Sequence, residues 1–228
     1  MAAERQLLPE PLPAEPMTMA AAWLADAWRQ RAQQNPDAMV LATVDHRGHP
    51  AARVVLCKQI IAEPGYLLFY TNYGSRKGRE IAANPRGATV LYWDSLHRQL
   101  RVEGPIVKAL PAESDAYFAT RAWQSRVGAW ASEQSQPVAT RAQLVQAVRS
   151  AAARLGTPNV LAPSPSEQDV AVPRPPHWGG YRLWAESVEL WVEGEYRIHD
   201  RARWTRSLTP AGEHDFRAGA WTATRLQP

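Results

Sequence analysis

Four stretches of the sequence gather cationic and hydroxyl side chains that can bind a phosphate group. In the first, Tyr70 to Lys77, a strand-like segment leads through Gly74 into a helix-like segment that starts with Ser75-Arg76-Lys77. A helix N-terminus presents free N–H groups and a partial positive charge, which disfavours cations unless an anion lies beside them. The pattern indicates an anion site; the alternative is an ordinary solvated start of a helix.

The second stretch is the apolar run Val54-Val55-Leu56-Cys57, which Arg53 and Lys58 bracket. On a regular strand these two cations point to opposite faces, because their positions differ by an odd number. They therefore serve two different anions, or a bulge brings them together, or they simply reach water at the ends of the strand.

The third stretch contains Tyr117, Arg121 and Ser125 at a spacing of four residues, which would place them along one helical stripe. A phenol, a guanidinium and a hydroxyl together can bind phosphate, although an amphipathic helix would have the same pattern. In the fourth stretch Arg197, His199 and Arg201 alternate, so on a strand they share one face, either at an anion site or at an exposed outer face.

The elements that must position these residues are mostly short strands. The pattern predicts strands at residues 39–44, 51–57, 66–71, 88–93, 99–107, 181–183, 188–192, 196–204 and 221–226. It predicts helices at residues 18–34, 75–83, 111–121, 125–132 and 140–155. Strands at hairpin spacing, with helices inserted in blocks, favour a mainly β fold: an antiparallel β-barrel with peripheral helices.

We expect a mobile Pro-rich segment over residues 1–16 and a single domain over residues 17–228. A long surface loop is expected at residues 156–176 and a hairpin loop at residues 208–219.

Composition narrows the class of protein. The net charge is +4, but acidic residues are interspersed, so we expect no nucleic acid partner. No apolar run approaches the roughly 20 residues that span a bilayer, and no signal peptide is evident. We therefore expect a cytoplasmic protein that has no membrane partner. Cys57 is the only cysteine, and none of the six histidines has metal-ligand spacing, so we expect no metal. Of the three lysines, Lys58 and Lys77 lie in the stretches above.

Five motifs in order closely resemble the pyridoxine/pyridoxamine 5′-phosphate oxidase family, over about nine-tenths of the chain. They are Arg53-Val-Val-Leu-Cys-Lys58, Tyr70-Thr-Asn-Tyr-Gly-Ser-Arg-Lys77, Gly128-Ala-Trp-Ala-Ser-Glu-Gln-Ser135, Trp178-Gly-Gly-Tyr-Arg182 and Arg197-Ile-His-Asp-Arg201. The resemblance implies an FMN-binding split barrel and a homodimer with FMN at the subunit interface.

The resemblance also implies a set of site residues. FMN would be held by Arg53, Val54, Val55, Leu56, Cys57, Lys58, Tyr70, Thr71, Arg76, Lys77, Gln99, Gln134, Ser135, Trp191 and Arg201. The substrate would be held by Lys58, Tyr117, Arg121, Ser125, Arg197 and His199, of which Arg197 and His199 would be catalytic.

The implied activity is oxidation of a small phosphorylated pyridine, pyridoxamine or pyridoxine 5′-phosphate, to pyridoxal 5′-phosphate, with O2 as acceptor and H2O2 as product. One alternative is a related split-barrel flavin oxidase that acts on another aromatic ring, such as a phenazine precursor. Another is a flavin- or vitamer-binding protein without turnover.

Overall fold

The computed structural model describes residues 6–160 and 170–228. Their contacts divide into two compact units. The single domain expected over residues 17–228 stays a prediction. The barrel unit comprises residues up to Phe69, Glu80–Lys108 and Tyr181–Pro228, and the helical unit comprises Tyr70–Arg79 and Ala109–Gly180.

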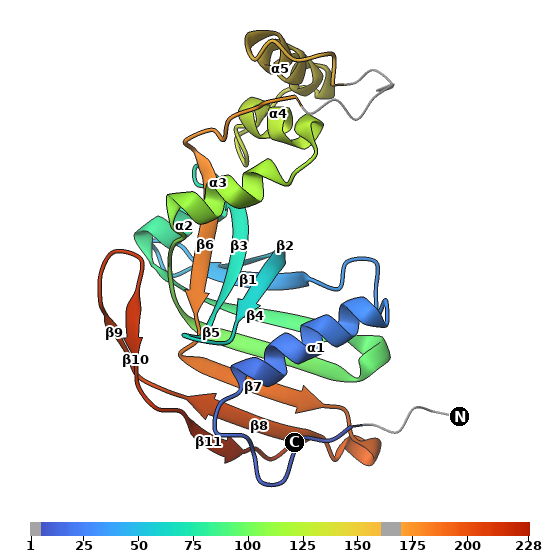
Figure 1. The fold of residues 1–228 in the computed structure, drawn as a ribbon, viewed down its shortest axis with the longest axis vertical. Coiled ribbons are helices and arrows are strands. Elements are labelled where there is room, and N and C mark those ends of the chain that lie inside the picture. Colours follow the sequence, from blue (N-terminus) through green and yellow to red (C-terminus); the bar gives the residue numbers. More distant parts are fainter. Residues whose placement is uncertain (1–5, 161–169) are drawn as a thin grey trace. The chain divides into compact units, whose positions relative to one another are not determined.

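An antiparallel sheet forms the barrel unit (Figure 1). Its strands are β1 (Ala38–Val44), β2 (Pro50–Ile61), β3 (Tyr66–Asn72), β4 (Arg86–Trp93), β5 (Arg98–Lys108), β6 (Trp178–Trp184), β7 (Ser187–Val192), β8 (Asp200–Thr205) and β11 (Thr222–Arg225), and β3 and β6 each run on into the helical unit. Their order is β11-β8-β7-β5-β4-β1-β2-β3-β6, and an additional β5–β6 pairing closes six of them into a barrel. The expected mainly β, antiparallel split-barrel fold is therefore confirmed.

The long strand β5 allows the barrel to split. Its first half pairs with β7, from Arg98↔Val192 to Glu103↔Ser187, and its end pairs with β6, from Ile106↔Leu183 to Lys108↔Tyr181. Gly104 lies at the change of partner, where a Cβ atom would stand 2.0 Å from the carbonyl oxygen of Trp184. The close approach of the two backbones therefore requires glycine.

Alternating burial along the strands builds the barrel core. In β5 every second side chain is buried over most of the strand, as expected where one face meets the core and the other does not. The largest fully buried side chains of this unit include Trp93, Trp184, Trp204, Phe69 and Met39.

The N-terminal segment lies against the barrel strands. Leu8 is buried, and its N–H donates to Asp200 Oδ2 at 2.7 Å. The Trp204 indole donates to the Pro13 carbonyl at 2.9 Å, and Arg225 donates to the Pro9 carbonyl at 3.0 Å. The described part of this segment thus makes hydrogen bonds to the barrel strands, and its expected mobility stays a prediction; residues 1–5 lie outside the described residues.

Helices supply the rest of the architecture. They are α1 (Met17–Arg29), α2 (Arg76–Ala83), α3 (Pro111–Ala119), α4 (Trp123–Ala131) and α5 (Arg141–Arg154). The helical unit has its own core, which includes Phe118, Trp123, Val127 and Trp178. Among the described residues, no helix combines the length and apolar character needed to cross a membrane.

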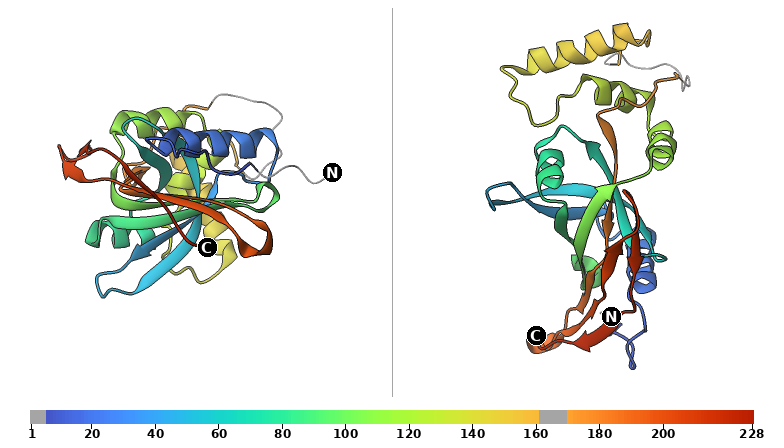
Figure 2. Two further views of the ribbon diagram at one scale, coloured as in Figure 1. Left: turned by 90° about the horizontal axis from the view of Figure 1, so that it is seen from below. Right: turned by 90° about the vertical axis from the view of Figure 1, so that its left-hand side faces the viewer.

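Most expected elements are confirmed, with shifted ends. The first helix ends at Arg29, because Arg31 adopts a left-handed φ of 51°. The segment 208–219 contains two short strands, β9 (Leu208–Pro210) and β10 (Phe216–Ala218), that pair as a separate two-stranded ribbon (Figure 2). No helix or strand occupies residues 156–160 or 170–176 of the expected long loop; its residues 161–169 lie outside the described residues.

Two expectations for the elements that carry site residues are wrong. The strand expected at 196–204 begins only at Asp200, after a 3-10 turn at Glu195–Arg197. The helix expected at 111–121 ends at Ala119, so Arg121 lies between α3 and α4, and Tyr117, Arg121 and Ser125 do not form one helical stripe.

Candidate functional site

The β2 stretch of the barrel unit carries a bulge at Lys58. β2 pairs with β3 through Cys57↔Phe69 and then Gln59↔Leu68, which leaves Lys58 as the extra residue. The bulge that the sequence left open is therefore present. The Lys58 ammonium lies 2.6 Å from Asp37 Oδ2 in an ion pair whose carboxylate is almost fully buried.

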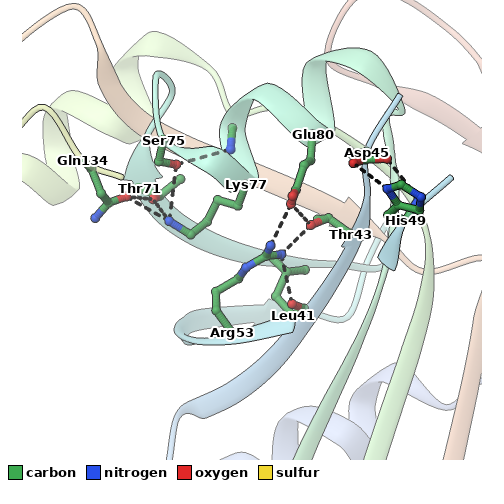
Figure 3. Close-up of polar contacts among 11 residues, drawn as sticks. Leu41, Thr43, Asp45, His49, Arg53, Thr71, Ser75, Lys77, Glu80 and Gln134 are labelled. Carbon is green, nitrogen blue, oxygen red and sulfur yellow. Dashed lines mark hydrogen bonds and ion pairs between the residues drawn. The ribbon is translucent and has the colours of Figure 1, made fainter. Parts of the chain in front are cut away.

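Arg53, on the same strand, lies in a compact polar network of the barrel unit (Figure 3). Its guanidinium lies 2.7 Å from Glu80 Oε2 and donates to the Leu41 carbonyl at 3.2 Å and to the Thr43 hydroxyl. The Thr43 hydroxyl donates to Glu80 Oε2 at 2.5 Å. The side chains of Arg53 and Glu80 are 20% and 5% exposed, so this is a mostly buried ion pair.

Lys77 is the centre of a second polar cluster, within the helical unit (Figure 3). The buried Lys77 ammonium donates to Gln134 Oε1 at 2.8 Å, to Thr71 Oγ1 at 3.1 Å and to Ser75 Oγ at 3.3 Å. Ser75 Oγ also accepts from the Gly78 N–H, which caps the start of α2. The structure thus brings Thr71, Lys77 and Gln134 together, and Arg76, Gln134 and Ser135 are exposed. Their expected role in holding FMN stays a prediction.

An aromatic stack in the helical unit holds Arg121. The rings of Tyr70 and Tyr117 stack with centroids 4.0 Å apart, and Trp178 stacks on Tyr70 at 5.5 Å. The Arg121 guanidinium lies 4.8 Å from the Trp178 ring centroid, and burial lowers the pKa of Arg121. Its Nη1 atom is buried and makes no hydrogen bond within the described residues. Ser125 is exposed. Of the expected trio, only Tyr117 and Arg121 therefore lie together, both against the Trp178 ring.

Three of the expected FMN residues form one row across the sheet of the barrel unit. Gln99 of β5 is paired with Trp191 of β7, which is paired with Arg201 of β8. Arg201 donates to Glu189 Oε1 from Nη2 at 2.8 Å and from Nε at 3.1 Å. An amide, an indole and a guanidinium side by side can contact a planar ring system.

The segment after β7 has a strained backbone. Tyr196 and Arg197 both adopt left-handed φ values, 54° and 66°, and Tyr196 is 90% exposed. His199 Nδ1 accepts a hydrogen bond from the Gly194 N–H at 3.2 Å, and its ring lies 4.8 Å from that of Trp191. Nδ1 thus acts as an acceptor, and the neutral imidazole carries its proton on Nε2. Strain of this kind costs about 1–3 kcal/mol per residue and is typical of functional segments.

Sequence reasoning missed the acidic partners of the expected cations. Asp37, Glu80 and Glu189 are all buried, and they pair with Lys58, Arg53 and Arg201 respectively. Their separations from these cations along the chain follow no motif, so no local pattern could identify them.

The donor set fits a phosphorylated cofactor and a phosphorylated substrate. The unsatisfied Nη1 of Arg121 is a buried cationic donor that can bond an anion. Within the described residues, no group of His, Cys, Asp and Glu could hold a metal ion. The antiparallel barrel is that of a split-barrel protein, and each of the two units has cationic side chains of a type that can bind a phosphate group.

Comparison with known proteins identifies the family. Residues 24–154 match the family described as pyridoxamine 5′-phosphate oxidase, and residues 178–228 match one described as the pyridoxine 5′-phosphate oxidase C-terminal dimerisation region. The chain therefore belongs to the pyridoxamine 5′-phosphate oxidase family.

Individual relatives agree with this assignment. Proteins named pyridoxine/pyridoxamine 5′-phosphate oxidase are 48% identical in Paracoccus denitrificans and 44% identical in Cereibacter sphaeroides, each over 94% of this chain and 95% of the relative. The crystal structure of PhzG from Burkholderia lata, in complex with tetrahydrophenazine-1-carboxylic acid, has a TM-score of 0.78 at 30% identity and covers 95% of this chain and 94% of PhzG.

Proposed function

We propose that this protein oxidises pyridoxine 5′-phosphate and pyridoxamine 5′-phosphate to pyridoxal 5′-phosphate. The observation that carries the proposal is its 40–48% identity to relatives bearing that oxidase name, over at least 85% of the chain. The buried Nη1 of Arg121 supports a phosphorylated substrate, because a dianion would satisfy it.

The proposed cofactor is FMN, for which the donor set above is suited. In the barrel unit the proposal assigns to FMN the residues Arg53, Val54, Val55, Leu56, Cys57, Lys58, Gln99, Trp191 and Arg201. In the helical unit it assigns Tyr70, Thr71, Arg76, Lys77, Gln134 and Ser135. When bound, FMN would supply the two-electron redox chemistry of this oxidation, with O2 as the final acceptor and H2O2 as its product.

The side chains of this chain supply binding and orientation. To the substrate phosphate the proposal assigns Lys58 in the barrel unit and Tyr117, Arg121 and Ser125 in the helical unit. It assigns Arg197 and His199 to the pyridine ring and its C4′ substituent. The hydrogen bond from the Gly194 N–H to His199 Nδ1 leaves Nε2–H as a donor for the hydroxyl or amine of the substrate. With the amine substrate, water hydrolyses the resulting imine and ammonia leaves.

A homodimer is the proposed assembly. The C-terminal match to a dimerisation region supports it, and so does an apolar stripe on the sheet of the barrel unit. Val54 is paired with Val40, which is paired with Val90, and Val54 is 65% exposed. A second copy that covered this stripe would remove apolar surface from water, worth about 25 cal/mol per Å².

Oxygen consumption tests the proposal. The purified protein with added FMN is expected to consume O2 and form equal amounts of H2O2 and pyridoxal 5′-phosphate from either substrate. FMN-loaded protein that consumes no O2 with either substrate would support the binding protein instead.

The similarity to PhzG favours one further candidate, an oxidase of reduced phenazine carboxylates. Turnover of tetrahydrophenazine-1-carboxylic acid in the same assay, without turnover of the phosphorylated vitamers, would establish that candidate.

A further inference from the structure

Asp37 contacts the β2 bulge twice. Its side chain is only 4% exposed, and Oδ2 lies 2.6 Å from the Lys58 ammonium. Its backbone carbonyl accepts a hydrogen bond from the Cys57 N–H at 2.7 Å. One acidic residue therefore fixes both the main chain at the bulge and the charged end of the lysine that protrudes from it.

The geometry of the bulge explains why such an anchor matters. β2 pairs with β1 as far as Leu56↔Ala38 and with β3 from Cys57↔Phe69 onward, so the strand changes partner at the point where Lys58 is inserted. A bulged residue has no direct partner on the facing strand, and lysine has a long, flexible side chain. Without a fixed contact, the Lys58 ammonium would sample many positions.

The pair is also arranged with the cation outward. The Lys58 side chain is 25% exposed and the Asp37 side chain is 4% exposed, so the carboxylate lies deeper than the ammonium. An ammonium has three N–H donors, and the bond to Asp37 uses one of them. Lys58 therefore keeps donors for an incoming anion while Asp37 holds it.

We propose that Asp37 is a positioning residue that holds the Lys58 ammonium ready for the phosphate of the substrate. The inference rests on the proposed function, since it assigns that phosphate to Lys58. Asp37 acts only through Lys58 and does not itself contact the substrate.

Steady-state kinetics of the FMN-loaded enzyme test this role. Asp37→Ala is expected to raise KM for pyridoxine 5′-phosphate by about tenfold, the size of one charge-assisted contact, with kcat changed little. Asp37→Asn keeps a carbonyl oxygen that can accept from Lys58, so it is expected to restore much of the lost affinity. With unphosphorylated pyridoxine, wild type and Asp37→Ala are expected to have the same KM.

A double-mutant cycle with Lys58→Met separates positioning from a general structural effect. If Asp37 acts through Lys58, adding Asp37→Ala to Lys58→Met leaves KM unchanged. Glu186→Ala, which removes the partner of Arg86 from a more exposed ion pair of the same unit, is the matched control and is expected to behave as wild type. If Asp37→Ala does not fold, Asp37→Leu, which fills the buried volume without an acceptor for Lys58, carries the same cycle.

Three outcomes would overturn the inference: an unchanged KM in Asp37→Ala, an equal rise in its KM for pyridoxine, or a full effect of Asp37→Ala in the Lys58→Met background. Failure of the proposed function is distinguishable from these, because wild-type enzyme would then oxidise neither phosphorylated substrate.

Discussion

The ion pair between Arg53 and Glu80 provides a test of whether the protein keeps buried charge for function or for stability. The perturbation is Glu80→Ala. It removes the carboxylate that lies 2.7 Å from the Arg53 guanidinium and that also accepts from the Thr43 hydroxyl. Arg53, whose side chain is 20% exposed, then keeps only the neutral oxygens of Leu41 and Thr43.

The expected cost follows from the burial of the pair. Removing one partner of a buried ion pair costs about 3–5 kcal/mol. Because Arg53 retains two neutral acceptors and some exposure, we expect the lower end, about 3 kcal/mol of unfolding free energy. For a chain of this length, that corresponds to a fall in melting temperature of about 6–12 °C.

Replacing all three polar side chains of this network separates a role of the buried charge in function from a role in stability. The triple variant Thr43→Val, Arg53→Met, Glu80→Leu leaves no charge in this network, and we expect its stability to return to within about 1 kcal/mol of wild type. If Arg53 helps to hold FMN, the same variant binds FMN more weakly, measured by quenching of flavin fluorescence. The pair would then serve function and not stability.

Urea unfolding of the apoprotein is the assay, with Glu186→Ala as a matched control of an ion pair that is more exposed. The control is expected to change stability by less than about 1 kcal/mol. The reasoning is refuted if Glu80→Ala unfolds within about 0.5 kcal/mol of wild type. It is also refuted if the triple variant binds FMN as tightly as wild type.

Four further predictions follow from single side chains. Arg121→Ala removes the proposed phosphate contact and is expected to raise KM for pyridoxine 5′-phosphate while leaving kcat nearly unchanged; steady-state kinetics that show a loss confined to kcat would contradict this role. Arg197→Ala is expected to lose turnover and keep bound FMN, and a colourless purified variant would show the assignment to be wrong. Burial raises the pKa of the Cys57 thiol to about 12, so the folded protein is expected to resist alkylation by iodoacetamide at pH 8. Because the fold favours the neutral thiol, the free energy of unfolding is expected to fall as the pH rises above about 9. Rapid labelling without denaturant would contradict the burial of Cys57. Val54→Glu places a charge on the apolar stripe and is expected to yield a monomer by analytical ultracentrifugation, whereas an unchanged dimer would exclude this face from the interface.

Much of the fold was predictable because strand periodicity is a local signal. Strands such as β1 and β4 were expected within one or two residues of their bounds, since their alternating apolar residues meet one core. The β2 bulge could only be left open, because it arises where the strand changes partner between β1 and β3, and pairing is not a local property.

The sequence patterns gave wrong secondary structure where the backbone leaves the regular conformation inside the pattern. The alternation of Arg197, His199 and Arg201 suggested a strand, but left-handed φ values at Tyr196 and Arg197 turn the chain before β8 begins. The spacing of Tyr117 and Arg121 suggested one helix, yet α3 ends at Ala119 and α4 begins only at Trp123.

The acidic residues that hold the cations could not be found from the sequence. Glu80 was indistinguishable from a solvated residue of α2 until the fold paired it with Arg53. Long-range ion pairs of this kind depend on the tertiary arrangement of strands and helices, so a three-dimensional structure is needed to identify them.

The measurement that tests the central claim most directly is the ratio of kcat/KM for pyridoxamine 5′-phosphate to that for pyridoxamine. If the cations assigned to the substrate bind its phosphate through charge-assisted hydrogen bonds, the phosphorylated substrate is favoured by at least about tenfold, since each such bond contributes about 1.5–3 kcal/mol. Equal values for the two substrates would mean that these cations bind no phosphate during turnover.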